Sequence, residues 1–199
     1  MPAYDWQTQL AVAMCYAKQM GADPVLTWVH AGPTTANWAK DEQTVPVLDT
    51  AFFFADARNS SQTALATTFV HFTNPPITGT ISTDPTIAWD TVPITGYVQQ
   101  RLSMRDAFVT MKLGPQDVYR MTAQEGLAFL GSYHTKESSL SLGVLDVQEY
   151  HLDQFIPVEK RQRVPLLVWI AMYSKDTQSL RFIIDPYTGE VLVRDTPSN

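Results

Sequence analysis

The stretch from Phe182 to Leu192 constrains the fold most, because a strand, a tight turn and a second strand follow directly from its residues. Phe182-Ile183-Ile184 is an apolar, β-branched run, and Glu190-Val191-Leu192 opens the next strand. Between them, a proline presets one turn dihedral angle and a glycine accepts a positive φ. We therefore expect an antiparallel hairpin closed by a structural turn. The residues to which we assign that turn are Asp185, Pro186, Thr188 and Gly189.

The same order of features recurs earlier in the chain. Residues 69–81 also pass from an apolar run through proline and Thr-Gly to a β-branched exit. A Val-Pro pair opens a strand before each copy, at Val45 and Val164, and a glycine ends a helical pattern at Gly21 and Gly114. Internal similarity of this kind defines the unit that folds. The sequence therefore predicts a duplicated chain, each half a helix followed by three strands.

This pattern predicts an α+β protein made of two tandem units, each a helix packed on an antiparallel sheet. The first unit covers residues 1–83, a linker rich in proline and threonine covers 84–102, and the second unit covers 103–199. We expect helices at 5–20 and after Ser103. The expected strands are 25–31, 45–55 and 63–73 in the first unit, and 117–122, 164–173 and 179–185 in the second.

The second unit carries an insertion at about 127–155 that the first unit lacks. Loops longer than about 12 to 15 residues inside a compact domain are often functional or contain their own secondary structure. Ala128-Phe129-Leu130 and Gly143–Val147 could supply an added hairpin. A structural hairpin and a partner-binding insertion both remain open.

Composition narrows the class of partner. The chain is 45% hydrophobic and 17% charged with a net charge of −6, and its basic residues are scattered except at 160–163. This is not the basic surface that neutralises a run of phosphates, so we expect no nucleic-acid partner. No stretch reaches the roughly 18 apolar residues of a membrane span, and residues 1–20 lack the features of a signal peptide. We expect a soluble protein without membrane insertion. An extracytoplasmic location stays open if a leader has been removed.

Residues that could carry catalysis or bind a metal are sparse. The histidines His30, His71, His134 and His151 are far apart, and only His151 with Asp153 offers two ligands on one strand face. A zinc site normally needs three or four ligands. No nucleophile elbow, phosphate loop or zinc-protease motif is present. We therefore assign no catalytic, cofactor-binding or metal-binding residue and expect no cofactor.

The single cysteine, Cys15, cannot form an intramolecular disulfide. It lies between Met14 and Tyr16 in the first helical pattern, which favours a small buried hydrophobe over a reactive thiol.

Aromatic residues in long polar segments are the candidates for partner binding. Trp38 lies in the loop 32–43, where an exposed aromatic side chain would anchor an interface. Trp169 instead alternates with apolar neighbours and is typical of a core. The partner-binding candidates are Asn37, Trp38, Tyr133, His134, Tyr150 and His151.

The chain resembles the PepSY domain family. The resemblance is carried by the helix start Ser103 to Ala107 and by the turn from Asp185 to Val191, and it is most specific over 179–193. The first unit resembles the family only through the second, with Asn74-Pro75-Pro76-Ile77-Thr78-Gly79 in place of the sharper turn. The resemblance implies small α+β domains, often paired and exported, that bind or inhibit other proteins and have no catalytic residues.

Two functions remain open from the sequence. The first is a non-catalytic protein-binding module that acts as an inhibitor, immunity protein or regulator of another protein, with a homodimer left open. The second is a small-molecule-binding protein or enzyme of cystatin-like α+β fold, in which a helix and a curved sheet enclose an apolar cavity. We favour a protein without enzymatic activity over an enzyme. A filled core with exposed aromatic residues would favour the first function, and a pocket of several hundred Å³ with convergent polar groups would favour the second.

Overall fold

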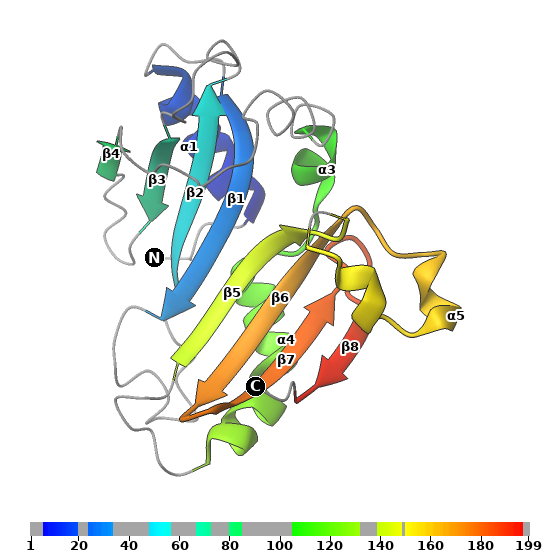
Figure 1. Cartoon of the computed structure of the whole chain (residues 1–199). Coiled ribbons are helices and arrows are strands. Elements are labelled where there is room, and N and C mark those ends of the chain that lie inside the picture. The colour runs from blue at the N-terminus through cyan, green and yellow to red at the C-terminus, as the bar shows by residue number, and fades with distance from the viewer. Residues whose placement is uncertain are drawn as a thin grey trace. The chain divides into compact units, whose positions relative to one another are not determined.

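A computed structural model describes residues 6–19, 24–33, 48–56, 67–72, 80–84, 105–131, 139–148 and 150–196 (Figure 1). The chain is α+β, and the paired strands are antiparallel. It divides into two compact units. Unit 1 contains residues 1–29 and 50–110, and unit 2 contains residues 30–49 and 111–199.

The described residues of unit 1 form two helices and antiparallel strands. Helix α1 (Trp6–Gln19) precedes strands β1 (Pro24–Pro33), β2 (Leu48–Asp56), β3 (Thr67–Phe72) and β4 (Thr80–Asp84), and the short helix α3 (Arg105–Thr110) follows them. The strand order is β4-β3-β2-β1. In the register, Phe52 is opposite Val70 and Val70 is opposite Ile81.

The core of unit 1 forms where α1 covers the sheet. The Trp6 ring stacks on Phe52 of β2 with 5.5 Å between ring centroids, and both side chains are buried. Leu10 and Ala13 lie on the same buried side of α1, as their helical spacing predicts. Cys15 is exposed, so the prediction of a buried cysteine is wrong. Two residues past Ala13 is about 200° around a helix, which turns Cys15 away from the core.

Unit 2 is a helix and four strands with a short covering segment. Helix α4 (Pro115–Leu130) is followed by β5 (Ser139–Asp146), the 3₁₀ helix η2 (Leu152–Phe155), the short helix α5 (Val158–Arg161), β6 (Leu167–Lys175), β7 (Gln178–Ile184) and β8 (Val191–Asp195). The strand order is β5-β6-β7-β8. Tyr173 is opposite both Leu140 of β5 and Leu180 of β7, which places these three side chains on one face of the sheet.

Helix α4 covers that face, packing on β6 and β7. Val118, Thr122, Gly126 and Leu130 recur every four residues along its buried side. A Cβ atom placed on Gly126 would lie 2.3 Å from two atoms of the Tyr173 ring. The Tyr173 hydroxyl is 2.8 Å from the Thr122 hydroxyl, and the Tyr173 side chain is fully buried. The interface between α4 and the sheet is therefore filled by the Tyr173 ring.

The sequence prediction of a strand at 117–122 is wrong, because these residues lie in α4. Gly114 precedes the helix, its N–H donates to Asp117 Oδ2 at 3.0 Å, and Pro115 occupies the first turn. Proline is favoured there because the N–H that it lacks has no partner inside the helix. We interpreted Gly114 as a helix end, whereas it begins the helix.

The remaining strand predictions agree with the structure to within a few residues. Strands β1, β2, β3, β6 and β7 overlap the predicted ranges. The 127–155 segment does not form the suggested separate hairpin. Residues 128–130 end α4, and Gly143 lies in β5, which pairs with β6 as a regular strand of the sheet.

The turn between β7 and β8 has the predicted geometry. Gly189 has a φ of 81°, which confirms the predicted positive value. Asp185 Oδ1 accepts hydrogen bonds from the backbone N–H groups of Tyr187 at 2.7 Å and Thr188 at 3.2 Å. The Pro186 carbonyl accepts from Lys112 and Leu113 N–H, both at 3.1 Å. The turn therefore closes the hairpin and also holds the chain that leads into α4.

Within the part of the chain that the structure describes, no helix is long and apolar enough to cross a membrane.

Candidate functional site

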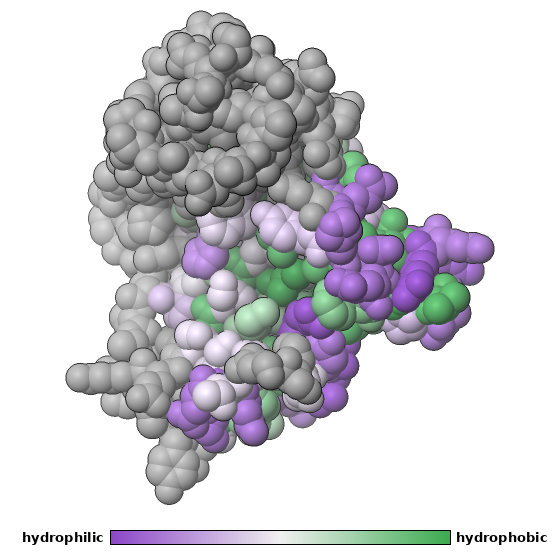
Figure 2. All heavy atoms as spheres, viewed as in Figure 1, coloured by the Kyte–Doolittle hydropathy of each residue, from purple (hydrophilic) through white to green (hydrophobic). Residues whose placement is uncertain are grey.

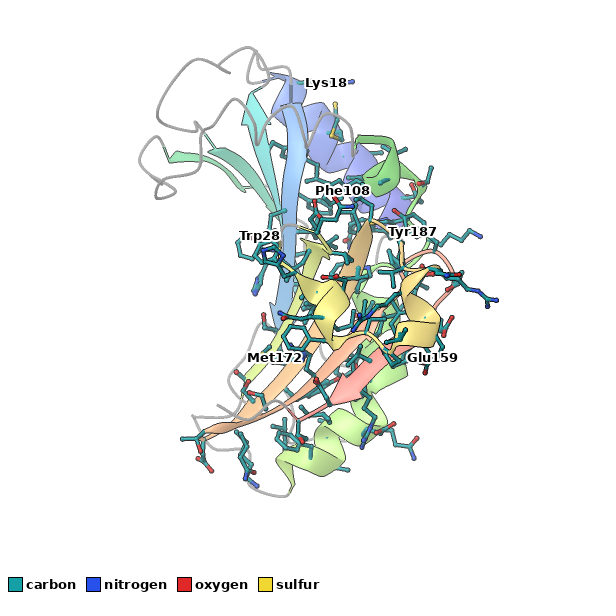
Figure 3. All side chains as sticks on the ribbon, turned by 45° about the vertical axis from the view of Figure 1, so that its right-hand side comes forward. Lys18, Trp28, Phe108, Glu159, Met172 and Tyr187 are labelled. Atoms are coloured by element: carbon teal, nitrogen blue, oxygen red, sulfur yellow. The ribbon has the colours of Figure 1, made fainter. Side chains whose placement is uncertain are left out.

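The face of the unit 2 sheet opposite α4 carries η2 and α5 (Figures 1 and 3). Leu152 and Ile156 anchor this segment in a buried apolar cluster with Ile170 of β6 and Ile183 of β7. Just before it, the buried Asp146 accepts the Gln148 N–H at 2.7 Å through Oδ1, which turns the chain at the end of β5. His151 takes a left-handed conformation with φ of 51° and begins η2. The sheet therefore holds the segment through its apolar side chains.

Two basic side chains fix the far end of the segment. The Arg161 guanidinium donates to the Ile156 carbonyl from Nε at 2.9 Å and to the Gln154 carbonyl from Nη2 at 3.4 Å. Lys160 Nζ forms an ion pair with Glu190 at 2.9 Å and donates to the Val191 carbonyl at 3.0 Å. These bonds satisfy carbonyl groups that the short helices leave open and attach α5 to the start of β8.

Apolar side chains project from this fixed segment into solvent. The exposed fractions are 42% for Tyr150, 43% for Phe155 and 71% for Val158. Figure 2 shows hydrophobic residues among the hydrophilic residues around α5. We call residues 150–163 the η2–α5 surface. Tyrosine and phenylalanine side chains are enriched in protein interfaces.

The Phe155 ring rests on a buried cation. The Arg181 guanidinium carbon lies 4.2 Å from the centroid of the Phe155 ring. Arg181 itself makes a bidentate pair with Asp195, with Nε to Oδ1 at 2.9 Å and Nη2 to Oδ2 at 2.5 Å. The paired carboxylate fixes the plane of the guanidinium, and a cation over an aromatic face is attractive. The orientation of Phe155 is therefore preset.

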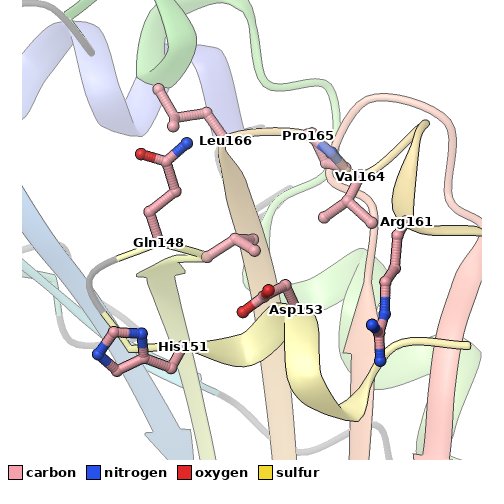
Figure 4. A pocket seen from close by; sticks show the side chains of 8 residues that line it. Gln148, His151, Asp153, Arg161, Val164, Pro165 and Leu166 are labelled. Atoms are coloured by element: carbon pink, nitrogen blue, oxygen red, sulfur yellow. The ribbon is translucent and has the colours of Figure 1, made fainter. Parts of the chain in front are cut away.

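A pocket of about 550 Å³ opens beside the η2–α5 surface (Figure 4). Its apolar lining comes from Val147 at the end of β5 and from Val164, Pro165 and Leu166 on the way into β6. Gln148, His151, Asp153 and Arg161 supply its polar lining. The volume lies within the range of about 300 to 1,000 Å³ that is usual for ligand sites.

Potential metal ligands at this surface are few among the residues that the structure describes. No group of three or more histidine, cysteine, aspartate or glutamate residues in the described ranges could hold a metal ion. His151 and Asp153 both line the pocket, but they lie at the start of η2, so the prediction that they share a strand face is wrong. They remain two ligands, fewer than a zinc site normally uses.

The titratable groups with shifted pKa values lie elsewhere. Burial raises the pKa of the Tyr173 hydroxyl well above its usual value, although its hydrogen bond to Thr122 acts in the opposite direction. Burial also raises the pKa of Tyr119 on α4. Burial lowers the pKa of His30 in β1. The two tyrosines belong to the packed α4 side of unit 2, so their shifts reflect the core.

The structure describes only two of the six residues predicted to bind a partner. Tyr150 and His151 lie side by side at the start of the η2–α5 surface, and both are exposed. Asn37, Trp38, Tyr133 and His134 lie outside the described residues. Phe155, Val158 and Arg181 were missed by the sequence interpretation. The pattern Phe155-Ile156-Pro157-Val158, apolar residues around a proline inside a polar segment, was the available signal for two of them.

No protein-family model, curated protein or solved structure matches this chain. The resemblance to the PepSY family therefore stays a prediction from the sequence.

Proposed function

We propose that this chain is a non-catalytic protein-binding module, acting as an inhibitor, immunity or regulatory protein of another protein. The observation that carries the proposal is the η2–α5 surface, where Phe155 and Val158 project from a segment that the sheet, Arg161 and Lys160 hold in place. A fixed aromatic side chain loses little conformational freedom on binding, so more of its contact energy contributes to affinity.

Two observations bear on the cystatin-like alternative. The pocket of about 550 Å³ with its polar lining residues is the kind of site that favours a small-molecule ligand, whereas the filled interface between α4 and the sheet opposes a cavity at the place that a cystatin-like site requires. That alternative places a ligand in a cavity between helix and sheet. In unit 2 the Tyr173 ring occupies this space and leaves no room even for a Cβ atom on Gly126. Tyr150, Phe155 and Val158 are exposed on the opposite side of the sheet, at the η2–α5 surface.

We further propose that the chain contains two tandem PepSY-like domains, covering 1–83 and 103–199 with a linker at 84–102, which are bounds that differ from those of the compact units 1 and 2. The Asp185–Gly189 turn, the strands on either side of it and a helix on one face of an antiparallel sheet support this assignment for unit 2. Helix α1 stacked on β2 supports it for unit 1. An experimental structure in which the two units superpose would test it, and two unrelated topologies would end it.

The binding proposal is tested by affinity purification of the full chain from its source cells, followed by mass spectrometry and titration of each partner. We expect Phe155→Ala to weaken a genuine complex by about 2 kcal/mol, because buried aromatic anchors typically contribute that much. Val158→Asp should weaken it further by placing a charge at the interface. Trp38→Ala tests the 32–43 loop in the same assay.

Met121→Asp is the matched control. Met121 lies on α4 and is 42% exposed, comparable with Phe155, but it belongs to the other side of the sheet. It should leave affinity unchanged. If Val158→Asp, Phe155→Ala and Trp38→Ala all retained the wild-type partners at wild-type affinity, the binding proposal would be wrong.

A further inference from the structure

The pocket is lined in part by residues of the η2–α5 surface, His151, Asp153 and Arg161, and its interior offers contacts to a small ligand. Val147, Val164, Pro165 and Leu166 supply its apolar lining, and Asp153 and Arg161 add one negative and one positive charge to that lining. The pocket therefore combines an apolar contact area with one carboxylate and one guanidinium.

The two charges do not neutralise each other. Both residues belong to the described part of the chain, and the ion pairs found there do not join Asp153 to Arg161. Arg161 donates hydrogen bonds from Nε to the Ile156 carbonyl and from Nη2 to the Gln154 carbonyl. Its Nη1 group can still donate to a ligand. Neither backbone carbonyl removes its positive charge. Each group therefore retains capacity for a ligand of opposite charge.

The backbone holds both charged residues at the pocket. Asp153 lies inside η2. The first residue of η2, Leu152, donates its backbone N–H to the Val147 carbonyl at 2.9 Å, which ties η2 to the end of β5. Arg161 is the last residue of α5, and its bonds to the 154–156 backbone fix its distance from η2. His151, also in the lining, adds a ring that can donate or accept a hydrogen bond.

We infer that this pocket binds a short zwitterionic ligand with apolar side chains, a free apolar amino acid or dipeptide. Its ammonium group faces Asp153, its carboxylate faces Arg161, and its side chain packs on Val164 and Leu166. Charge-assisted hydrogen bonds at both ends select a ligand that has both termini free. The volume of about 550 Å³ accommodates a dipeptide. This inference goes beyond the proposed protein binding and does not depend on it.

The probe is the dipeptide Leu-Leu, titrated into the full-length ¹⁵N-labelled chain and followed by amide chemical shifts. We expect a dissociation constant on the order of 1 mM or tighter, from the affinity usual for a ligand of this size. The shifted amides should belong to 147–166. N-acetyl-Leu-Leu lacks the ammonium and Leu-Leu amide lacks the carboxylate, so each should bind about 10-fold or more weakly.

Asp153→Asn tests the protein side of the same contact. It keeps the shape of the side chain and removes its charge, so Leu-Leu should bind about 10-fold more weakly to it. Glu159→Gln is the matched control, an exposed carboxylate on α5 that does not line the pocket, and affinity should stay within about twofold. The ligand series tests the Arg161 contact without disturbing the bonds that Arg161 makes to η2.

Three results would overturn the inference. The first is the absence of shifts in 147–166 at saturating Leu-Leu. The second is equal binding of Leu-Leu and its acetylated or amidated form. The third is unchanged affinity in Asp153→Asn. The proposed function is tested separately, by the affinity of a protein partner for the Phe155→Ala variant. A negative result with Leu-Leu would leave that test unaffected, so the two failures are distinguishable.

Discussion

At position 126, α4 lies so close to β6 that glycine is the residue that leaves room for the Tyr173 ring. Alanine favours a helix over glycine by about 1 kcal/mol, so propensity alone would make Gly126→Ala stabilising. The added methyl group would instead lie 2.3 Å from the ring, which its burial and its bond to Thr122 hold in place. We expect Gly126→Ala to lower the free energy of unfolding by roughly 1 to 3 kcal/mol, measured by urea titration with circular dichroism.

Ala128→Gly separates packing from propensity in that experiment. Ala128 is exposed on the same helix, so its replacement should cost about 1 kcal/mol through propensity alone. A Gly126→Ala protein as stable as the wild type would mean that α4 and β6 can separate freely, contrary to a filled interface.

At Gly189 the backbone conformation, and not the available space, restricts which residues can replace glycine. A Cβ atom there would lie 3.7 Å from Leu113 and Met121 side-chain atoms, which is ordinary contact, but φ is 81°. We expect Gly189→Val to cost about 1 to 3 kcal/mol through backbone strain, read as a lowered melting temperature. Gly189→Asn should cost less, since asparagine tolerates positive φ better. Equal melting temperatures for all three proteins would show that the turn does not need glycine.

At the scale of elements, the sequence predicted best where local chemistry decides the structure. The turn after Ile184 contains its own signals, an aspartate that accepts two backbone N–H groups and a glycine with positive φ. Strands β6 and β7 were found because both faces of a central strand are apolar, which favours β-branched and aromatic residues over a long run.

Part of helix α4 was wrongly predicted as a strand because the contacts that stabilise the helix come from residues distant in sequence. Val118, Tyr119 and Thr122 favour strands intrinsically, and the buried stripe contains Gly126, which no propensity scale would place in a helix core. Packing on Tyr173 decides the outcome. The proline at the first turn and Asp117 three residues after Gly114 were local signals for a helix start. The strand at 117–122 was predicted instead from the expected repeat of the first half.

The η2–α5 surface was only half predictable for a related reason. Tyr150 and His151 stood out as an aromatic and a titratable residue in a long polar segment. The exposure of Phe155 depends on a cation supplied by β7 and on that cation's pairing with β8. The apolar residues around Pro157 were a local signal for Phe155, but the contact with Arg181 and the pocket join residues so distant in sequence that they leave no local pattern.

For the molecule as a whole, unit 2 separates stability from interaction. One side of its sheet is closed by α4, with Trp169 and Tyr173 fully buried and the Trp169 Nε1–H bonded to the Leu113 carbonyl at 2.9 Å. The other side is covered by short helices, which Leu152 and Ile156 anchor in an apolar cluster and which carbonyl bonds and an exposed ion pair also hold. Substitutions on the α4 side should therefore change stability, and substitutions at Phe155, Val158 or Asp153 should change binding with little effect on stability.

The buried Tyr173 hydroxyl makes the stability of the folded chain depend on alkaline pH. Burial raises its pKa above the value of 10.0 that it has when exposed, so the unfolded chain loses this proton first as pH rises. The stability that it contributes is present below pH 10 and is lost above it, by about 1.4 kcal/mol per pH unit until the folded pKa is reached. Tyr173→Phe cannot ionise and loses only the bond to Thr122, worth about 1 kcal/mol.

We therefore expect wild type to exceed Tyr173→Phe in free energy of unfolding by about 1 kcal/mol near pH 9, and this gap to close or reverse near pH 11. Urea titrations at both pH values measure it. Tyr150→Phe, at an exposed tyrosine, should keep a constant gap to wild type over the same range. A gap for Tyr173→Phe that also stays constant would mean that the ring is accessible to water, because only a desolvated hydroxyl resists ionisation in the folded state. It would equally contradict the filled interface that separates the α4 side of the sheet from the η2–α5 surface.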